Sequence, residues 1–313
     1  MIRKLIEKIR KPRRNFKANN LIIGLVIGLL VLALLSIGTI SWGVYKLRWQ
    51  GKFINQVLSI LPLPAADVNG TFILYPDYLK ALKAAEKFYA KQKVQGLPNI
   101  PSSEKMQQIV MEDRLIENVL VKEIAQNYNV SVVSAEINAK MDEIIASKGS
   151  ASEVEKFLQD YYDLDIAEYK KYFIEPNLYY DKTNEAIEED DLINGEAKKK
   201  IQEALNKLRN GEDFAKVAAE YTEDQDALGN KLTKENFLRG ELPKDIEDQL
   251  FGMKAGDYTD ILTLPGALVI FKLDNKDEAK GVLSINKIVI KIKTITDLLK
   301  EQKNKAQIKI YAY

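Results

Sequence analysis

Residues 21–45 read LIIGLVIGLLVLALLSIGTISWGVY, a stretch of the chain that contains no charged side chain. As an α-helix with a rise of ~1.5 Å per residue, it would be ~37 Å long, which exceeds the ~30 Å hydrocarbon core of a bilayer. The stretch therefore predicts one membrane-spanning helix near the N-terminus, preceded by a tail of residues 1–20.

The charges that flank this stretch predict its orientation. The tail carries one acid, Glu7, and eight basic residues: Arg3, Lys4, Lys8, Arg10, Lys11, Arg13, Arg14 and Lys17. The far side offers only three basic residues close by, Lys46, Arg48 and Lys52. The positive-inside rule then places the tail in the cytoplasm and the remaining chain outside it. Trp42, Tyr45 and Trp49 would lie among the outer headgroups, which favours the same single-pass arrangement in the cell membrane.

Two alternatives treat the N-terminus as an export signal. A cleaved signal peptide would need an apolar region of about 7–15 residues and a small-residue cleavage site, whereas this stretch is longer and no clear site follows it. Arg13-Arg14-Asn15-Phe16 resembles a twin-arginine signal, although such a pair arises easily in a basic tail.

Composition excludes several kinds of chemistry. The chain has no histidine and no cysteine, so it can hold neither a histidine-dependent catalytic triad nor a disulfide. Of the 46 basic and 45 acidic residues, 38 and 44 lie beyond the tail, which gives that part a net charge of −6. We therefore expect no nucleic-acid partner, and we expect no cofactor and no metal.

Residues 46–187 show mainly helical periodicity. An apolar segment over 51–63 leads to Pro62 and Pro64, and residues 67–75 suggest short extended pieces around a turn. Apolar residues at three-and-four spacing then predict helices at 76–93, 104–128, 134–148, 152–161 and 166–187, with breaks at Gly149 and Asp163.

The pattern changes after the acidic run 188–191, which we interpret as a solvated linker rather than a metal site. Beyond it, helices are expected at 196–209, 214–220, 245–251 and 296–305. Strands are expected at 258–262, 267–273, 284–291 and 307–311. The fold class is thus one transmembrane helix, an all-α domain and an α+β domain with a small antiparallel or mixed sheet.

The helical part resembles a known chaperone domain. Asp67-Val68-Asn69-Gly70, Arg114-Leu115-Ile116-Glu117-Asn118 and Tyr128-Asn129-Val130-Ser131-Val132 are similar to the N-terminal domain of SurA and its relatives. The resemblance continues weakly through 169–176. It implies an extracytoplasmic chaperone domain over 46–187 that binds unfolded or newly translocated polypeptides.

The C-terminal part resembles parvulin-type peptidyl-prolyl isomerases. The pieces that occur in the family's order are 211–215 (GEDFA), 218–224 (AAEYTED), 239–243 (RGELP), 250–251 (LF), 255–257 (AGD) and Gly266 before an apolar strand. The resemblance implies a parvulin-like domain over 188–313. Together the two regions resemble the SurA and PrsA family of folding factors.

The parvulin resemblance departs at the family's first strand. Parvulins begin with a strand that carries a His-Ile-Leu motif, but the acidic run occupies this place here. Residues 284–291 (SINKIVIK) have the alternation of that strand, with Lys287 where the histidine would stand. We expect the sheet to be completed by this strand, so that the domain is permuted, and hydrogen bonds between 284–291 and 267–273 would support this. The alternative is an unrelated terminal hairpin.

The resemblance also implies a set of pocket positions. Leu242 lies near the family's pocket Met, Phe251 matches its pocket Phe, and Leu268 is expected to replace the second histidine. Asp224 or Asp226 lies near a polar pocket position, although both also fit a solvated loop. Calcium is another reading of this loop, but its spacing breaks the EF-hand pattern.

Three functions follow from these observations. The favoured one is a membrane-anchored chaperone whose parvulin-like domain is a second binding face. An active prolyl isomerase, weak without histidine, is the second, because rotation about the prolyl bond needs no covalent chemistry. The third is a structural envelope module that uses tyrosine pairs such as Tyr161-Tyr162 and Tyr179-Tyr180 as contacts. The sequence predicts no particular oligomeric state.

Overall fold

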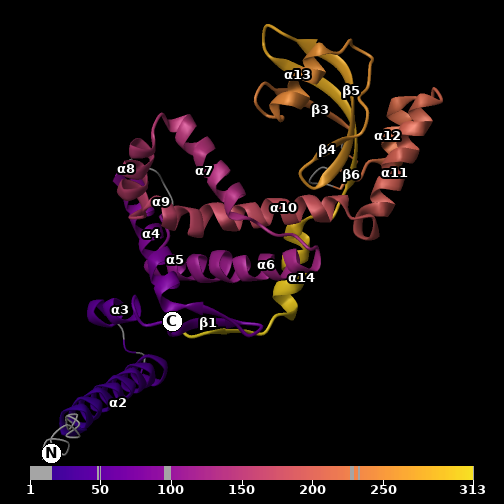
Figure 1. Ribbon diagram of the computed structural model, residues 1–313. Coiled ribbons are helices and arrows are strands. Elements are labelled where there is room, and N and C mark those ends of the chain that lie inside the picture. The colour runs from indigo at the N-terminus through magenta and orange to yellow at the C-terminus, as the bar shows by residue number, and fades with distance from the viewer. Residues whose placement is uncertain are drawn as a thin grey trace, which may run out of the picture. The chain divides into compact units, whose positions relative to one another are not determined.

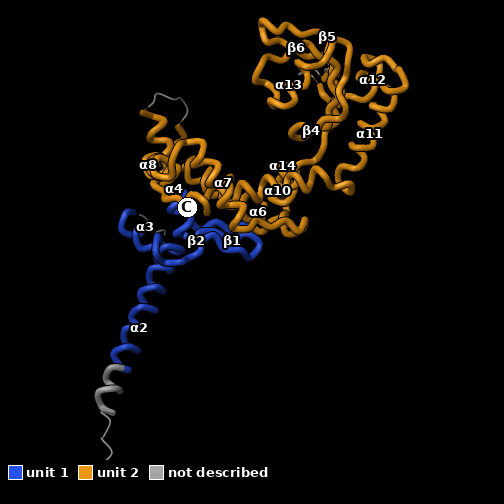
Figure 2. Tube along the Cα trace, turned by 45° about the horizontal axis from the view of Figure 1, so that its top comes forward, with its two compact units in different colours: residues 1–82, 308–313 blue, residues 83–307 orange. Residues whose placement is uncertain are grey.

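The computed structural model describes residues 16–47, 49, 51–94, 100–225, 229–231 and 233–312, with side chains from residue 23 onward. The chain divides into two compact units, residues 1–82 with 308–313 and residues 83–307 (Figure 2). Most of the tail, including the arginine pair, lies outside the described residues, as does Asp226.

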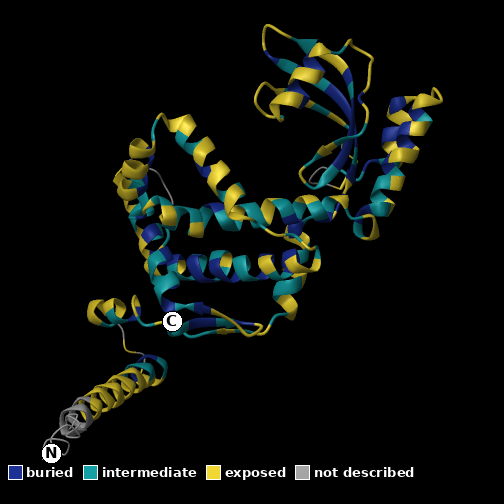
Figure 3. Ribbon diagram, viewed as in Figure 1, coloured by how far each residue is buried: buried dark blue, intermediate teal, exposed yellow. Residues whose placement is uncertain are grey.

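The first unit contains the predicted apolar helix. Helix α2 spans Phe16–Leu47, and its part from Ile23 to Leu47 is long and apolar enough to cross a membrane. Its apolar side chains up to about residue 39 are exposed, as Figure 3 shows.

A small sheet follows α2 within the same unit. After the short helix α3 (Lys52–Leu58), strands β1 (Pro64–Val68) and β2 (Thr71–Leu74) form the expected extended pieces around the turn Asn69-Gly70. Strand β7 (Ile308–Ile310) pairs antiparallel with the other edge of β1. The expected strand at 307–311 is therefore present, but it belongs to this sheet and does not join the C-terminal one.

The second unit begins within α4 (Tyr75–Val94) and continues through a run of helices (Figure 1). They are α5 (Ser103–Val110), α6 (Glu117–Asn127), α7 (Ser134–Lys148), α8 (Ala151–Tyr162), α9 (Ile166–Tyr169) and α10 (Glu175–Glu189). The predicted breaks are confirmed, because Gly149 and Asp163 both have positive φ. Two helices predicted as continuous contain π-helical segments, η2 (Met111–Ile116) and η3 (Lys170–Ile174).

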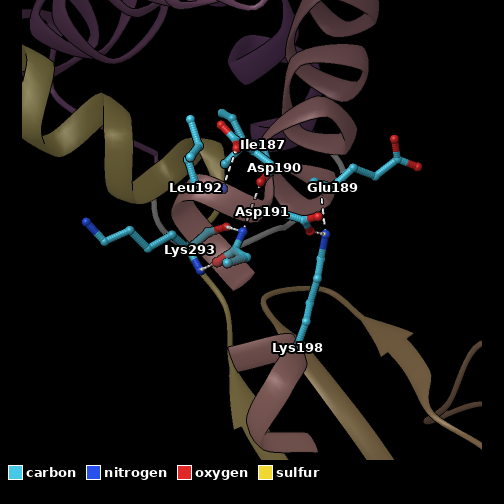
Figure 4. Close-up of polar contacts among 8 residues, drawn as sticks. Ile187, Glu189, Asp190, Asp191, Leu192, Lys198 and Lys293 are labelled. Carbon is cyan, nitrogen blue, oxygen red and sulfur yellow. Dashed lines mark hydrogen bonds and ion pairs between the residues drawn. The ribbon is translucent and has the colours of Figure 1, made fainter. Parts of the chain in front are cut away.

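The acidic run is a helix junction and not an extended linker. It ends α10, and Asp190 caps α11 (Asp191–Arg209) by accepting a hydrogen bond of 2.8 Å from the Leu192 amide. Four residues later, Asn194 is buried and binds the main chain of Lys293 and the carbonyl of Ile187. Figure 4 shows Ile187 and Lys293 on either side of this junction. Glu189 and Asp191 are exposed, as expected of a solvated run, but the run lies in a helix junction that the buried Asn194 amide ties to a distant segment.

The remaining elements build a four-stranded antiparallel sheet in the order β3-β6-β5-β4. Its strands are β3 (Lys234–Leu238), β4 (Leu262–Leu264), β5 (Ala267–Asp277) and β6 (Val282–Lys291). Helices α11 and α12 (Phe214–Tyr221) cover one face, and α13 (Lys244–Gly252) covers the other. Helix α14 (Ile295–Lys305) leaves the sheet and packs against α6 and α10.

Two strand predictions differ from the structure. The expected strand at 258–262 is reduced to an isolated bridge between Tyr258 and Lys272, and β4 begins only at Leu262. Strand β3 was not expected, because its residues KENFL carry two charges and only two apolar side chains. It is an edge strand, where exposed polar side chains are common.

The expected pairing of 284–291 with 267–273 is present. Strand β6 runs antiparallel to β5 from the pair Ala267 and Lys291 to the pair Asp277 and Val282. Strand β6 therefore lies in the middle of the sheet, between β5 and β3.

Candidate functional site

Alternation along the two central strands separates their side chains onto two faces. Leu268 and Ile270 of β5 pack with Ile288 and Ile290 of β6 against α11 and α12. Val269, Phe271 and Leu273 face the other way, toward α13. Because successive strand residues point to opposite faces, a pocket on one face can use only every second residue.

Lys287 lies on the α13 face, directly opposite Phe271 in the ladder. Its side chain is only 8% exposed, and its ammonium group lies 2.6 Å from the Asp224 carboxylate. Glu235 of β3 forms a second ion pair with the same ammonium group. Asp224 and Glu235 are themselves partly exposed, so the cluster forms a rim between solvent and the sheet.

The surroundings of Lys287 keep it charged. Burial alone would lower the pKa of its ammonium group, but the hydrogen bonds and charges of Asp224 and Glu235 outweigh burial and raise the pKa. Lys287 therefore donates hydrogen bonds and offers no lone pair. One cation between two carboxylates leaves the cluster with one net negative charge.

Phe251 and Leu242 lie on the same face as Lys287. Phe251 is 9% exposed and belongs to the cluster that contains Phe271, Leu250 and Ile285. Leu242 is half-buried and packs against this cluster. The guanidinium of Arg239 lies 4.0 Å from the centre of the Phe251 ring, a cation–π contact on the outer side of the ring.

Leu268 lies on the opposite face, in the cluster covered by α11 and α12. The structure thus brings together Phe251, Leu242, Lys287 and Asp224 on one side of the sheet and separates Leu268 from them. On β5, Val269 is the neighbour of Leu268 that faces α13. The alternation along β5 could have identified Val269 as the residue that faces α13, because residues 269 and 271 are two positions apart and therefore share a face of the sheet.

Sequence reasoning also missed Glu235 and Phe237. Both lie on β3 with side chains less exposed than their neighbours, and the Phe237 ring is 6.3 Å from the Phe271 ring. The only available signal was the alternation of KENFL, which is short and half charged.

The arrangement suits binding more than bond-breaking chemistry. Among the described residues, no group of three or more acidic side chains is placed to hold a metal ion. The face combines aromatic and aliphatic side chains with a charged rim, and none of its groups is a neutral base. Such a surface can hold an apolar peptide segment and can favour a twisted prolyl amide by shape and hydrogen bonding.

A second candidate surface lies on the helical part of the second unit. Its aromatic side chains are all incompletely buried and contact one another in pairs at centroid distances of 4.6–6.4 Å. We call this set the aromatic cluster: Phe88, Tyr89, Phe157, Tyr161, Tyr162, Tyr169 and Phe173. Phe157 is the most open member with 41% of its surface exposed.

Basic side chains cover parts of the aromatic cluster. The Arg114 guanidinium lies 3.9 Å from the centre of the Phe173 ring and donates a hydrogen bond of 2.8 Å to the Tyr172 carbonyl. This contact joins the π-helical segment η2 to η3. Burial lowers the pKa of Arg114, while Tyr162 and Tyr169 raise it to a smaller extent. The Arg114 side chain therefore helps to hold Phe173 in place within the aromatic cluster.

The other tyrosine pair has a packing role. Tyr179 lies below the Lys122 ammonium group at 5.0 Å, and the Tyr180 hydroxyl is 2.9 Å from the Thr296 hydroxyl of α14. Tyr179 and Tyr180 thus connect α10 to neighbouring helices.

Two families match the chain. The family described as the SurA-like N-terminal domain matches residues 6–163, which is half of the chain, and the PPIC-type PPIase domain matches residues 182–275. The second match ends before β6 begins at Val282.

Curated relatives are foldases. The chain is 24% identical over 191 residues to the foldase protein PrsA of Geobacillus kaustophilus, which covers 57% of this chain and 66% of that protein. It is 33% identical over 82 residues to the foldase protein PrsA of another Geobacillus strain, covering 26% of this chain and 30% of that one. The match thus spans just under two thirds of the first relative.

A crystal structure of the foldase protein PrsA from Lactococcus lactis is similar at 16% identity and a TM-score of 0.26, covering 77% of this chain and 84% of that one. The SurA-like match over half of the sequence shows the family by itself. The chain therefore belongs to the family with a SurA-like N-terminal domain, and it also carries a PPIC-type PPIase domain, as SurA/PrsA-like proteins do.

Proposed function

We propose that this chain is a membrane-anchored, extracytoplasmic folding factor that binds unfolded or newly translocated polypeptides. The observation that carries the proposal is the aromatic cluster, because seven contiguous aromatic side chains remain partly exposed in the helical part. Exposed apolar patches of this kind on a folded protein mark sites of interaction. The PrsA names of the relatives support the same reading.

An aggregation assay tests the role of the aromatic cluster. A chemically unfolded client is diluted into buffer with the detergent-solubilised full chain, and light scattering is followed. The double substitution Phe157→Ser and Tyr161→Ser should weaken the suppression of aggregation, since it removes the open, stacked pair. Leu192→Ser is the matched control, because Leu192 is 97% exposed and lies outside the cluster. Equal loss in both variants would contradict the proposal.

The parvulin-like domain supplies a second binding face in this proposal. Its pocket lacks both histidines because the chain contains none, and Lys287 takes the place of one of them. We propose that β6 completes the sheet from the C-terminal side and makes the domain a permuted parvulin. The pairing of β6 with β5 and β3 supports this, as does the end of the family match at residue 275.

Prolyl isomerisation is the second candidate function. It is favoured by the apolar face around Phe251, which can bind a twisted prolyl bond without a general base. Turnover of a proline tetrapeptide measures it, with Phe251→Ala as the comparison. No acceleration over the spontaneous rate would remove this function and leave the chaperone function intact.

A structural envelope module is the remaining alternative. It predicts that the chain does not suppress client aggregation at all, with or without the aromatic cluster. The aggregation assay above therefore separates this alternative from the folding factor.

The proposed topology places residues 1–20 in the cytoplasm and the body outside. The absence of cysteine makes labelling clean, because each introduced cysteine is the only one. In whole cells, an impermeant maleimide should label Ser147→Cys, which is exposed in α7, and should not label Asn15→Cys in the tail. The reverse pattern would contradict the topology.

A further inference from the structure

The chain folds back on itself directly after α2. The Trp49 amide donates a hydrogen bond of 3.1 Å to the Gly43 carbonyl, within the last turns of the helix. The Trp49 ring packs on Gly43 so closely that an added Cβ would lie 2.7 Å from Trp49 Cζ3. Trp49 is therefore close to the level of Gly43 along the helix axis.

The same end of α2 is built into the small sheet of its unit. Val44 is 3% exposed, and the Tyr45 hydroxyl donates a hydrogen bond of 2.9 Å to the Pro64 carbonyl at the start of β1. The Tyr45 ring also meets the Tyr311 ring edge-on at 5.6 Å, just beyond β7. These contacts fix the position of the small sheet relative to the C-terminal end of α2.

The segment between α2 and β1 exposes large apolar side chains. Phe53, the second residue of α3, is 74% exposed, and Ile60, two residues after the helix ends, is 83% exposed. Trp49 and Trp42 are also exposed on this part of the unit. In water, such side chains would cost free energy in proportion to their apolar area.

Charge on this segment is of one sign. The sequence contains no aspartate or glutamate from residue 8 to residue 66, whereas Lys46 and Lys52 flank the exposed side chains. A basic, aromatic and aliphatic surface without acids matches an anionic lipid surface and does not match a basic protein partner.

The length of α2 places this segment in the headgroup layer. Its 32 residues extend ~48 Å, while a bilayer with both headgroup regions measures about 40–45 Å. If α2 spans the bilayer, its C-terminal turns around Gly43 therefore lie at the outer interface. Lys52, the first residue of α3, follows Trp49 by three positions, which reach at most ~10 Å, so α3 begins close to the outer interface.

We propose that α3, with Trp49 before it and Ile60 after it, is an interfacial segment that inserts Phe53 and Ile60 among the lipid headgroups of the leaflet where α2 emerges. The inference rests on the membrane anchoring in the proposed function. The lipid surface is the occupant because Phe53 and Ile60 follow the last residue of α2 by only six and thirteen positions, on a segment whose charged residues are all basic. The small sheet then lies at a fixed distance from the membrane surface.

Depth-dependent quenching tests the proposal in the full-length protein, reconstituted in vesicles of phosphatidylcholine and phosphatidylglycerol. Because the chain has no cysteine, Phe53→Cys and Ile60→Cys each carry one environment-sensitive fluorophore. Nitroxide lipids labelled near the headgroup should quench both more strongly than lipids labelled at the end of the acyl chain.

Two controls separate this inference from the anchoring. Leu192→Cys, on an equally exposed leucine of the second unit, should not be quenched by any of the lipids. Leu30→Cys, in the middle of α2, should be quenched most by the deep nitroxide. If Leu30→Cys is quenched and Phe53→Cys is not, the interfacial segment is refuted and the span stands. If Leu30→Cys is also unquenched, the anchoring itself fails.

A protein partner on the same surface is the competing outcome. Self-association or client binding would shield the fluorophore at Phe53→Cys without lipid quenching, and dilution with excess lipid would abolish the shielding. That result would overturn the proposal. Native Trp49, observed in Trp42→Phe with no added fluorophore, provides an independent measurement of the same depth.

Discussion

Lys287 and Asp224 form an ion pair of 2.6 Å between the central strand β6 and the loop after α12. The pair closes the α13 face of the sheet at the position where the parvulin resemblance implies a histidine. Because Lys287 lies both in the central strand and on the face of the candidate pocket, a substitution there should change both the stability of the sheet and the pocket.

Lys287→Met should destabilise the sheet by about 1–3 kcal/mol, because Asp224 and Glu235 would be left as neighbouring carboxylates without their shared cation. Hydrogen exchange of peptides from β6 and β3 measures the local loss. Lys244→Met is the matched control, since Lys244 is 87% exposed and pairs with Asp248 one turn away. Faster exchange in both variants would refute a specific role for Lys287.

Glu223 should make the sheet sensitive to acid. Burial raises the pKa of its carboxyl, but hydrogen bonds from Lys200 and from the Lys291 amide outweigh burial and lower it below its ordinary value. The stabilisation is therefore complete above the unfolded pKa of ~4.3 and is lost as the pH falls through the lower folded value.

In Glu223→Gln, thermal stability measured by circular dichroism should fall less steeply below about pH 4.3 than in the natural sequence. The exposed Glu196 on α11 provides the control variant Glu196→Gln. Identical acid profiles for Glu223→Gln and the natural protein would contradict the linkage.

Asn194→Ala should cost about 1–3 kcal/mol, since it leaves the Lys293 amide and two carbonyl groups without their buried partner. Asn194→Asp keeps the oxygen that accepts from the Lys293 amide but removes both donated bonds. Its loss should be at least as large, because a carboxylate would face two carbonyl oxygens. Urea unfolding followed at 222 nm, a helix signal, ranks the variants; an unchanged midpoint in both would show that the junction is not held by this side chain.

Substitutions of Leu268 and of Phe251 should both lower stability, but only the substitution of Phe251 should weaken peptide binding. Leu268→Ala should lower stability by about 2–5 kcal/mol without changing the affinity for a proline-containing peptide, because Leu268 lies on the face covered by α11 and α12. Phe251→Ala should lower both. Fluorescence anisotropy with a labelled peptide gives the affinity, at a temperature where both variants remain folded. Equal affinities in the two variants would argue against a pocket at Phe251.

The helices could be predicted from the sequence because each carries its own signals. The bounds of α7 match the prediction, and α4, α8, α12 and α14 differ from it by one or two residues. The π-helical turns of η2 and η3 were not predicted, and in the structure Arg114 of η2 fits against Phe173 and the Tyr172 carbonyl of η3. Such a fit is a property of tertiary packing.

The candidate site was predictable only where the alternation was long. The eight alternating residues 284–291 identified both the strand and Lys287, whereas β3 is short and charged, and Glu235 was missed with it. Counting positions after Gly266 pointed to Leu268, but the face of a strand residue depends on register, and a shift of one residue exchanges the faces. Val269 is the residue that faces α13.

Strand β7 has a consequence for the order of events during synthesis. It fills the edge of β1, yet it is translated more than two hundred residues later than β1. While the rest of the chain is being made, β1 therefore presents an open edge that can pair with other extended chains. Only the arrival of residues 308–310 closes it, so a stalled or truncated chain would carry an unprotected strand edge next to α2.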